Sequence, residues 1–248
     1  MITPGPGSVR GAVVTFDQLD STNSEAMRRV AAGERGPLWL LAHQQTAGRG
    51  RSGRDWASPR GNLAVSLIFM LQCLPAHVPQ LSLIAGLAVH QALATLWPDG
   101  AASRRLRLKW PNDLLIDKAK LGGILVESTR YAADLVAVIG IGVNIAAPPV
   151  MLDRAVTAMA EHVSGPPAAE VLVSLLAERL DACLAEWSKP AGFDCLRTQW
   201  LDRAGPIGEA MSVNTGGRGG HWHVCRTGHG RGIAALWRKR QSTAVHVR

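Results

Sequence analysis

Residues 43–61 carry the side chains in this sequence that are best suited to bind an anion. Three glycines alternate there with three arginines: Gly48, Arg49, Gly50, Arg51, Gly53 and Arg54. Glycine lets the backbone reach positive φ, and arginine stays charged and can bind a carboxylate or a phosphate through two N–H groups. An apolar run precedes the stretch and a turn at 58–61 ends it, so we predict a loop that holds an anion. A basic loop facing solvent is the alternative.

The spacing of the same glycines also fits the dinucleotide-binding pattern G-x-G-x-x-G. That pattern requires a helix that opens at the third glycine and an acidic residue about 20 positions later. Pro59 and Gly61 interrupt any such helix, and no Asp or Glu occurs between Asp55 and Asp99. The context therefore argues against a nicotinamide or flavin cofactor.

A second group of polar residues stands at the predicted start of a helix. Thr22 and Glu25 are in the capping-box relation, and the helix that they start ends at Gly33. Ser21, Thr22 and Asn23 are therefore helix caps or ligand contacts. The two roles are compatible, because a helix start presents free N–H groups and hydroxyls to a polar ligand.

Lys120 is a third candidate, because glycines lie close to it in the predicted strands. Gly122 and Gly123 follow it and leave room for a ligand to approach the backbone. Gly140 and Gly142 mark a similar close approach in a later apolar strand. We expect a ligand to lie against the backbone at these positions.

The stretch 48–59 closely resembles the signature loop of biotin protein ligases. Three further blocks look like the same family and come in the same order: 21–24 (STNS), 109–114 (KWPNDL), and 120–127 (KLGGILVE) followed by 140–144 (GIGVN). The resemblance covers about residues 13–215. It implies a biotin/lipoate ligase-like catalytic domain.

This resemblance implies an ATP-dependent reaction that attaches biotin to a lysine of a biotin carboxyl carrier protein through biotinyl-5'-AMP. Biotin and ATP are then the substrates, and Mg²⁺ accompanies ATP. The positions that match the family's biotin contacts are Ser21, Thr22, Asn23, Gln45, Arg49, Gly50, Arg51, Lys120 and Gly123. Those that match its nucleotide contacts are Arg54, Trp56, Asn112, Asp113 and Asn144.

Lys120 and Arg51 are the residues that we expect to act in catalysis, as countercharges at the bond that forms. Asp113 is either a Mg²⁺ partner or a turn-capping residue after Pro111 and Asn112. We expect no metal site built from protein side chains alone. A cluster of His221, His223, Cys225 and His229 offers zinc ligands, but its glycine-rich surroundings favour a basic tail instead.

The fold class indicated by the sequence is α/β (α+β), a mixed β-sheet flanked by helices. Strands are expected at 10–19, 38–42, 62–70, 104–110, 114–116, 121–128 and 134–145, and helices at 26–32, 80–97, 150–162, 168–187 and 193–201. We predict a catalytic domain at 1–204 and a remnant of the family's SH3-like domain at 205–248. Residues 205–214 read as its first strand, and from Gly216 the strand alternation is lost, so this β segment is expected to depart from the SH3-like barrel.

Two alternative functions remain open. A lipoate or octanoate ligase uses the same activation chemistry, although the loop around Arg49 and Arg51 favours biotin. A biotin-responsive repressor would need an N-terminal DNA-binding domain larger than the stretch before Ser21. We therefore expect a monofunctional ligase, a monomer or homodimer, that recognises no specific DNA.

Charge and cysteine content indicate a cytoplasmic protein with no membrane partner. Residues 210–248 contain seven basic residues and no acid, which accounts for +7 of the net charge of +8 in the 248 residues. The rest of the chain is nearly neutral, so any affinity for nucleic acid belongs to this tail. The four cysteines show no paired spacing, and no apolar run of 18 residues or secretory signal occurs.

Overall fold

The computed structural model describes residues 8–97, 104–150 and 154–205, and the backbone of four strands between 210 and 246. The chain divides into two compact units, Met1–Arg203 and Ala204–Arg248. Each unit contains a β-sheet of its own.

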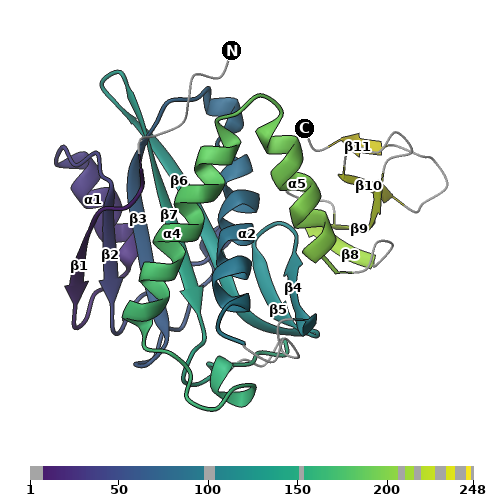
Figure 1. Cartoon of the computed structure of the whole chain (residues 1–248), viewed down its shortest axis with the longest axis horizontal. Coiled ribbons are helices and arrows are strands. Elements are labelled where there is room, and N and C mark those ends of the chain that lie inside the picture. Colours follow the sequence, from purple (N-terminus) through teal and green to yellow (C-terminus); the bar gives the residue numbers. More distant parts are fainter. Residues whose placement is uncertain are drawn as a thin grey trace. The chain divides into compact units, whose positions relative to one another are not determined.

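The first unit is built on a seven-stranded sheet with the order β1-β2-β3-β7-β6-β5-β4 (Figure 1). The strands are β1 (Ala12–Phe16), β2 (Leu38–Ala42), β3 (Leu63–Leu71), β4 (Leu106–Lys109), β5 (Asp113–Ile116), β6 (Ala119–Tyr131) and β7 (Asp134–Val143). β1 and β2 run parallel, and every other neighbouring pair is antiparallel. The predicted mixed sheet is confirmed.

Helices cover both faces of this sheet. Four α-helices are described in the first unit: α1 (Thr22–Ala31), α2 (Gln80–Ala94), α4 (Ala169–Trp187) and α5 (Gly192–Arg203). α2, α4 and α5 pack together on one face, whereas Ala26 and Val30 of α1 pack against Val136 and Val138 on the other. Alternate residues of a strand point to opposite faces, so the side of β7 that carries Val138 also carries Gly140 and Gly142.

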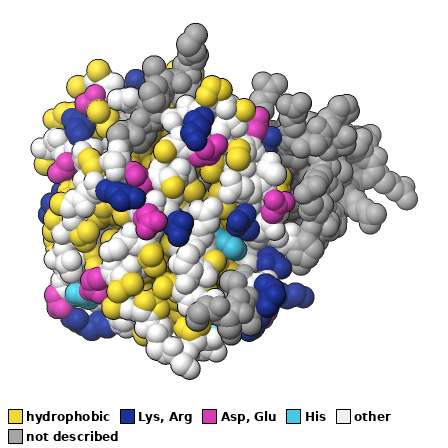
Figure 2. Space-filling model, viewed as in Figure 1, with side chains coloured by type: hydrophobic (Ala, Val, Ile, Leu, Met, Phe, Trp, Pro, Cys, Tyr) yellow, Lys and Arg dark blue, Asp and Glu magenta, His cyan; other side chains and the backbone are white. Residues whose placement is uncertain are grey.

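The helix predicted at 168–187 is confirmed, and it contributes to the core. In α4 the buried residues are Leu172, Val173, Leu176, Leu180, Cys183, Leu184 and Trp187. Their spacing of three and four places them along one side of the helix, which faces α2 and the sheet. On the molecular face in Figure 2, basic and acidic side chains are interspersed around the exposed apolar ones.

The helix predicted at 150–162 is wrong within the residues that the structure describes. Residues 154–158 are extended, and only a short 3-10 helix, η3 (Met159–Glu161), follows them. The reason is a backbone pairing with Lys120, which donates its N–H to Ala155 O at 2.9 Å and accepts from Thr157 N at 2.9 Å. This extended segment runs along the edge of the pocket described below.

The second unit is a four-stranded antiparallel sheet with the order β11-β10-β9-β8. Its strands are β8 (Ala210–Asn214), β9 (Gly219–Arg226), β10 (Ile233–Trp237) and β11 (Ala244–His246). Three of these strands, β9, β10 and β11, lie beyond Gly216, where the sequence lacks the usual alternation of apolar and polar residues. A ladder pairs backbone N–H and C=O groups, which glycine and arginine supply as well as other residues do.

The predicted departure of this second sheet from the family's barrel stays a prediction. The side chains of the possible zinc cluster, His221 to His229, lie outside the described residues.

Across the described parts of the chain, no helix combines the length and apolar character needed to cross a membrane.

Candidate functional site

Small residues leave a hollow on the sheet face that carries α1. Ala64, Gly142 and Gly123 stand side by side on β3, β7 and β6, and Gly140 lies two residues before Gly142. A Cβ at Gly142 would be 2.4 Å from the ring of Trp56. Glycine is therefore required there, because the indole occupies the space of a side chain.

Gly140 makes the same kind of contact with α1. A Cβ at Gly140 would lie 2.1 Å from Oδ1 of Asn23. The glycines of β7 thus receive one polar side chain from α1 and one aromatic side chain from the loop at 43–61. The expectation that a ligand lies against the backbone at Gly140 and Gly142 stays a prediction, and in this structure the side chains of Asn23 and Trp56 lie there.

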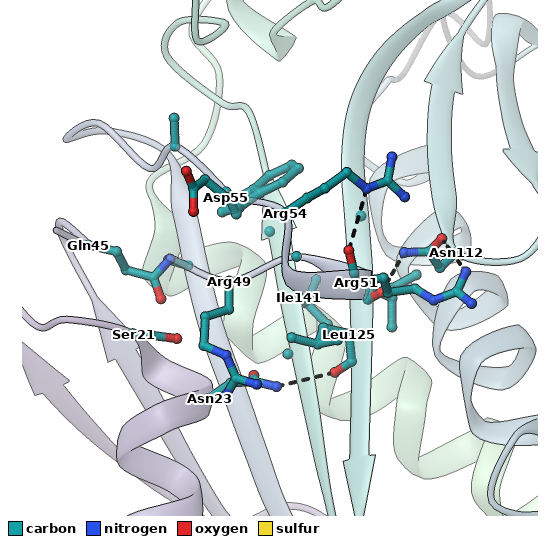
Figure 3. A pocket seen from close by; sticks show the side chains of 18 of the residues that line it. Ser21, Asn23, Gln45, Arg49, Arg51, Arg54, Asp55, Asn112, Leu125 and Ile141 are labelled. Atoms are coloured by element: carbon teal, nitrogen blue, oxygen red, sulfur yellow. Dashed lines mark hydrogen bonds between the residues drawn. The ribbon is translucent and has the colours of Figure 1, made fainter. Parts of the chain in front are cut away.

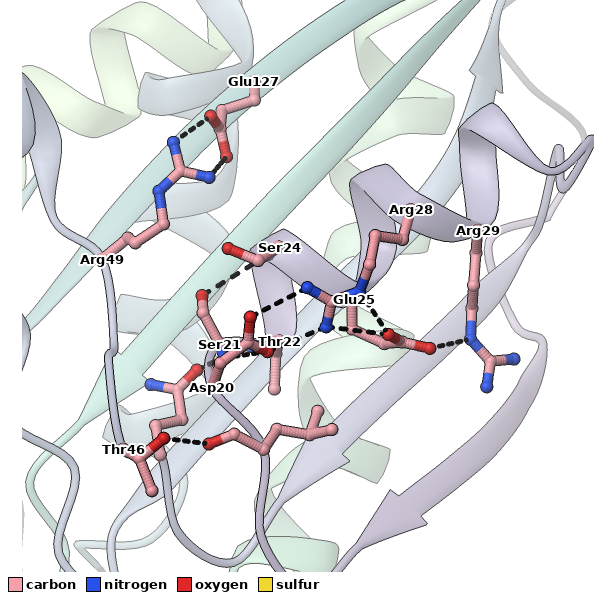
Figure 4. Close-up of polar contacts among 12 residues, drawn as sticks. Asp20, Ser21, Thr22, Ser24, Glu25, Arg28, Arg29, Thr46, Arg49 and Glu127 are labelled. Carbon is pink, nitrogen blue, oxygen red and sulfur yellow. Dashed lines mark hydrogen bonds and ion pairs between the residues drawn. The ribbon is translucent and has the colours of Figure 1, made fainter.

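The start of α1 is held by polar contacts (Figure 4). Ser21 caps the helix by accepting from Ser24 N at 3.4 Å. The capping box predicted between Thr22 and Glu25 is wrong, because Thr22 is the first residue of the helix and the Glu25 carboxylate accepts from Arg28 and Arg29. Asp20 accepts from Ser21 N at 2.7 Å and from both Nη atoms of Arg28 at 2.8 Å. The hydrogen bond from Arg28 lowers the pKa of the Asp20 carboxyl to about 2, so this support stays ionised at neutral pH.

Buried hydrogen bonds orient Asn23, which is 3% exposed. Ser66 Oγ lies 2.6 Å from Asn23 Oδ1, and Asn23 Nδ2 donates to Glu127 Oε2 at 2.9 Å. Because the hydroxyl is the donor to Oδ1, the amide has one orientation. Thr22 donates both its N–H, at 2.8 Å, and its hydroxyl, at 3.2 Å, to Oε1 of Gln45.

The glycine–arginine loop folds back on itself over the pocket. Gly50 N donates to Arg54 O at 2.7 Å, and the turn between them puts Ser52 at φ 56 and Gly53 at φ 71. Figure 3 shows Arg51 directed toward Asn112, whose Oδ1 accepts from Nη1 at 3.2 Å. The left-handed turn at Ser52 and Gly53 lets one short segment present several arginines to the same space.

Asp113 lies between two basic side chains at the edge of the sheet. Its Oδ1 accepts from Lys120 Nζ at 2.6 Å, and its Oδ2 lies 3.9 Å from Nη1 of Arg154. The Lys120 side chain is 14% exposed, and its Nζ lies 5.3 Å from the centre of the Trp56 ring. Burial lowers the pKa of Lys120, the neighbouring Asp113 opposes this, and the nearby guanidinium groups of Arg154 and Arg54 lower it further.

Asn144 lines the pocket and has a side-chain acceptor atom that is not hydrogen-bonded within the described residues. Its Nδ2 donates to Thr157 O at 3.0 Å, but its buried Oδ1 has no hydrogen-bond partner among the described residues. An unpaired buried carbonyl is costly, so it marks a place where a ligand donor would bind. The extended segment at 154–158, which sequence reasoning predicted as helix, holds this amide.

All fourteen residues predicted from the sequence line one pocket. They are Ser21, Thr22, Asn23, Gln45, Arg49, Gly50, Arg51, Arg54, Trp56, Asn112, Asp113, Lys120, Gly123 and Asn144. Their individual roles stay predictions. Sequence reasoning missed Arg154, which lines the same pocket, and Ser66 and Glu127, which support its wall. Glu127 is the last residue of the motif at 120–127, so the sequence offered a reason to consider it. Arg154 belongs to no motif, so no pattern in the sequence indicated it.

The residues present do not fit a direct Mg²⁺ ligand role for Asp113. Both of its carboxylate oxygens face cations, Lys120 and Arg154, at 2.6 and 3.9 Å. The described residues also include no group of three or more His, Cys, Asp or Glu that could hold a metal. Mg²⁺ keeps many water ligands and is commonly held by the phosphates of a nucleotide.

Comparisons with known proteins show the family of the chain. The model of the biotin/lipoate A/B protein ligase family matches residues 16–144. A biotin–acetyl-CoA-carboxylase ligase of Paracoccus denitrificans is 38% identical over 204 residues, which are 80% of this chain and 83% of that protein. The chain belongs to the biotin/lipoate A/B protein ligase family.

Two further relatives are matched by this chain over different shares of their own length. The biotin protein ligase of Leishmania major, solved in complex with biotinyl-5-AMP, is 26% identical, with a TM-score of 0.68 over 95% of this chain and 98% of that one. The bifunctional ligase/repressor BirA of Escherichia coli is 41% identical over 55% of this chain, but only 41% of its own length is matched. The predicted resemblance to biotin protein ligases is confirmed.

Proposed function

We propose that this protein attaches biotin to a lysine of a biotin carboxyl carrier protein, using ATP and passing through biotinyl-5'-AMP. One observation carries the proposal: basic side chains and the polar start of α1 meet at one pocket. The basic residues are Arg49, Arg51, Arg54, Lys120 and Arg154. The similarity to ligases of Paracoccus denitrificans and Leishmania major supports it.

The chemistry needs such a concentration of positive charge. A biotin carboxylate attacks the α-phosphate of ATP and pyrophosphate leaves, so two anions must meet. At about 4 Å two unit negative charges repel by roughly 4 kcal/mol at an effective dielectric near 20. Arg51 and Lys120 offset this repulsion and stabilise the charge that develops on the phosphate oxygens.

The start of α1 suits the uncharged ureido ring of biotin. Thr22 gives both of its donors to Oε1 of Gln45, which leaves the Gln45 amide N–H groups to donate to a ligand carbonyl. Asn23 and Ser21 lie beside it, and Gly123 also lines this pocket. Biotin would therefore lie with its ring at α1 and its carboxylate toward Arg51 and Lys120.

The nucleotide fits the opposite side of the pocket. Trp56 offers an aromatic face, and the unpaired Oδ1 of Asn144 can accept from the adenine amino group or from a ribose hydroxyl. Arg54 and Asn112 lie nearer the phosphates in this arrangement. In the second step the carrier lysine amine attacks the carbonyl carbon of the mixed anhydride, and AMP leaves with the electron pair of the broken bond.

The experiment that tests the proposal is a transfer assay with labelled biotin, ATP and a purified carboxyl-carrier domain. We expect label on the carrier with wild-type protein, none without ATP, and none on a carrier whose acceptor lysine is replaced. A parallel assay with labelled lipoate and its carrier separates the two ligase activities. Transfer of lipoate but not biotin would overturn the proposal in favour of the lipoate alternative.

We also propose that the protein does not bind a specific DNA sequence. We expect labelled duplex DNA to remain unshifted, with or without biotin, at an ionic strength that screens the basic residues of the tail. Size-exclusion chromatography with and without biotin and ATP distinguishes a monomer from a homodimer. A biotin-dependent, sequence-selective shift would instead support a repressor.

A further inference from the structure

The carboxylate of Glu127 joins three elements of the pocket wall. It lies on β6 and accepts from Asn23 of α1 at 2.9 Å. It also accepts from Arg49 of the glycine–arginine loop at 2.7 and 3.4 Å, as Figure 4 shows. The three residues are far apart in sequence, with separations of 104 and 78 positions. The Glu127 side chain is only 23% exposed, half as much as that of Arg49 at 46%.

This contact leaves Arg49 able to bind a ligand. The guanidinium of Arg49 has five N–H donors, of which two point to Glu127 and three are left. Asn23 has its amide nitrogen directed to Glu127, so its oxygen faces Ser66 and the space above Gly140. Glu127 therefore sets the direction of both side chains and leaves three N–H groups of Arg49 for a ligand.

We propose that Glu127 is a positioning residue for the biotin end of the pocket. It holds Arg49, and with it the glycine–arginine loop, against α1 before any ligand arrives. The glycines of the loop and its like charges disfavour a single ordered state, so one charge-assisted anchor on a rigid strand has a large effect. The inference rests on the proposed function, since it assigns this end to biotin.

A second ion pair from the same stretch provides a matched control. Arg60 donates to Asp17 at 2.6 Å, a bond as short as that of Arg49 with Glu127. The Asp17 side chain is 76% exposed and lies outside the pocket. Exposed pairs of this kind contribute little, so removing the Asp17 charge should affect neither the loop nor the ligand.

The experiment compares Glu127→Gln, Glu127→Asp and Asp17→Asn with the wild type. Each protein is measured for KM and kcat in biotin-dependent ATP–pyrophosphate exchange, and for backbone hydrogen exchange at 46–57 without ligand. Glu127→Gln keeps the volume but removes the negative charge and one of the two acceptor oxygens, and a single oxygen cannot make all three hydrogen bonds. We expect it to raise KM for biotin about tenfold to a hundredfold, to change KM for ATP little, and to speed exchange in the loop.

The same variants separate positioning from a general loss of structure. Glu127→Asp keeps the charge and should recover part of the biotin affinity, and Glu127→Gln should add little in an Arg49→Ala background. Equal increases in KM for biotin and ATP, or unchanged loop exchange in Glu127→Gln, would overturn the positioning role. A wild type that does not activate biotin would overturn the proposed function instead, while hydrogen exchange would still test Glu127.

Discussion

Replacing Lys120 by alanine tests the electrostatic argument for the pocket most directly. Lys120 is the basic residue with the shortest contact to a pocket carboxylate, 2.6 Å to Asp113, and its side chain is 14% exposed. Removing one preorganised donor at developing charge typically lowers kcat by about 10²–10³-fold, or about 2.7–4 kcal/mol. We expect Lys120→Ala to reduce biotin-dependent ATP–pyrophosphate exchange by at least this factor.

The same substitution also affects stability, and the structure limits by how much. Breaking a fully buried ion pair costs about 3–5 kcal/mol, because one charge is left unpaired. Here Asp113 is 20% exposed and Arg154 lies 3.9 Å from its other oxygen. We therefore expect a smaller loss, about 1–3 kcal/mol in free energy of unfolding, so the variant stays folded.

The assay is pyrophosphate exchange at saturating biotin and ATP, with urea unfolding of the same samples. Lys189→Ala is the matched control, since Lys189 pairs with Glu186 at 2.7 Å but is 64% exposed and lies outside the pocket. We expect the control to exchange at the wild-type rate. If the exchange rate of folded Lys120→Ala is within about fivefold of the wild-type rate, Lys120 does not stabilise the charge that develops on the phosphate oxygens.

Three further predictions follow from the geometry. Because burial lowers the pKa of Lys120, kcat/KM of exchange should fall as pH rises through a value below 10.5, and Lys120→Arg should remove that alkaline limb. Gly142→Ala would place a Cβ 2.4 Å from the Trp56 ring, so calorimetry should show ATP binding weakened about tenfold, whereas Gly86→Ala, with no neighbour nearer than 3.5 Å, should bind ATP normally. Burial lowers the pKa of His90 to about 4, so the unfolded chain binds a proton between pH 6.5 and 4 that the folded chain does not. The free energy of unfolding should therefore fall by up to about 3 kcal/mol as the pH is lowered through that range. Urea unfolding of His90→Gln at pH 7 and 4.5 should show a smaller fall than that of the wild type, and an equal fall would contradict the assignment.

Local patterns in the sequence were enough to predict most elements of the sheet, and the resemblance to biotin protein ligases indicated fourteen residues that line the pocket. The capping residues of α1, the apolar runs of β2 and β3, and the alternation of glycine and arginine after β2 are short-range signals with direct physical causes. The four motif blocks lie in the order of the chain and needed no contacts to be recognised. They contain thirteen of the fourteen predicted residues that line the pocket, all but Gln45, but they do not show how these residues face one another.

Tertiary structure alone decided which side chains complete the site. Ser66 meets Asn23 only because β3 and β7 pair with Ser66 opposite Gly140, and a register shifted by one residue would turn Ser66 to the other face. Arg154 enters the pocket because its segment pairs with Lys120 instead of forming a helix. Such contacts depend on strand register and backbone pairing between distant segments, and a local pattern contains neither.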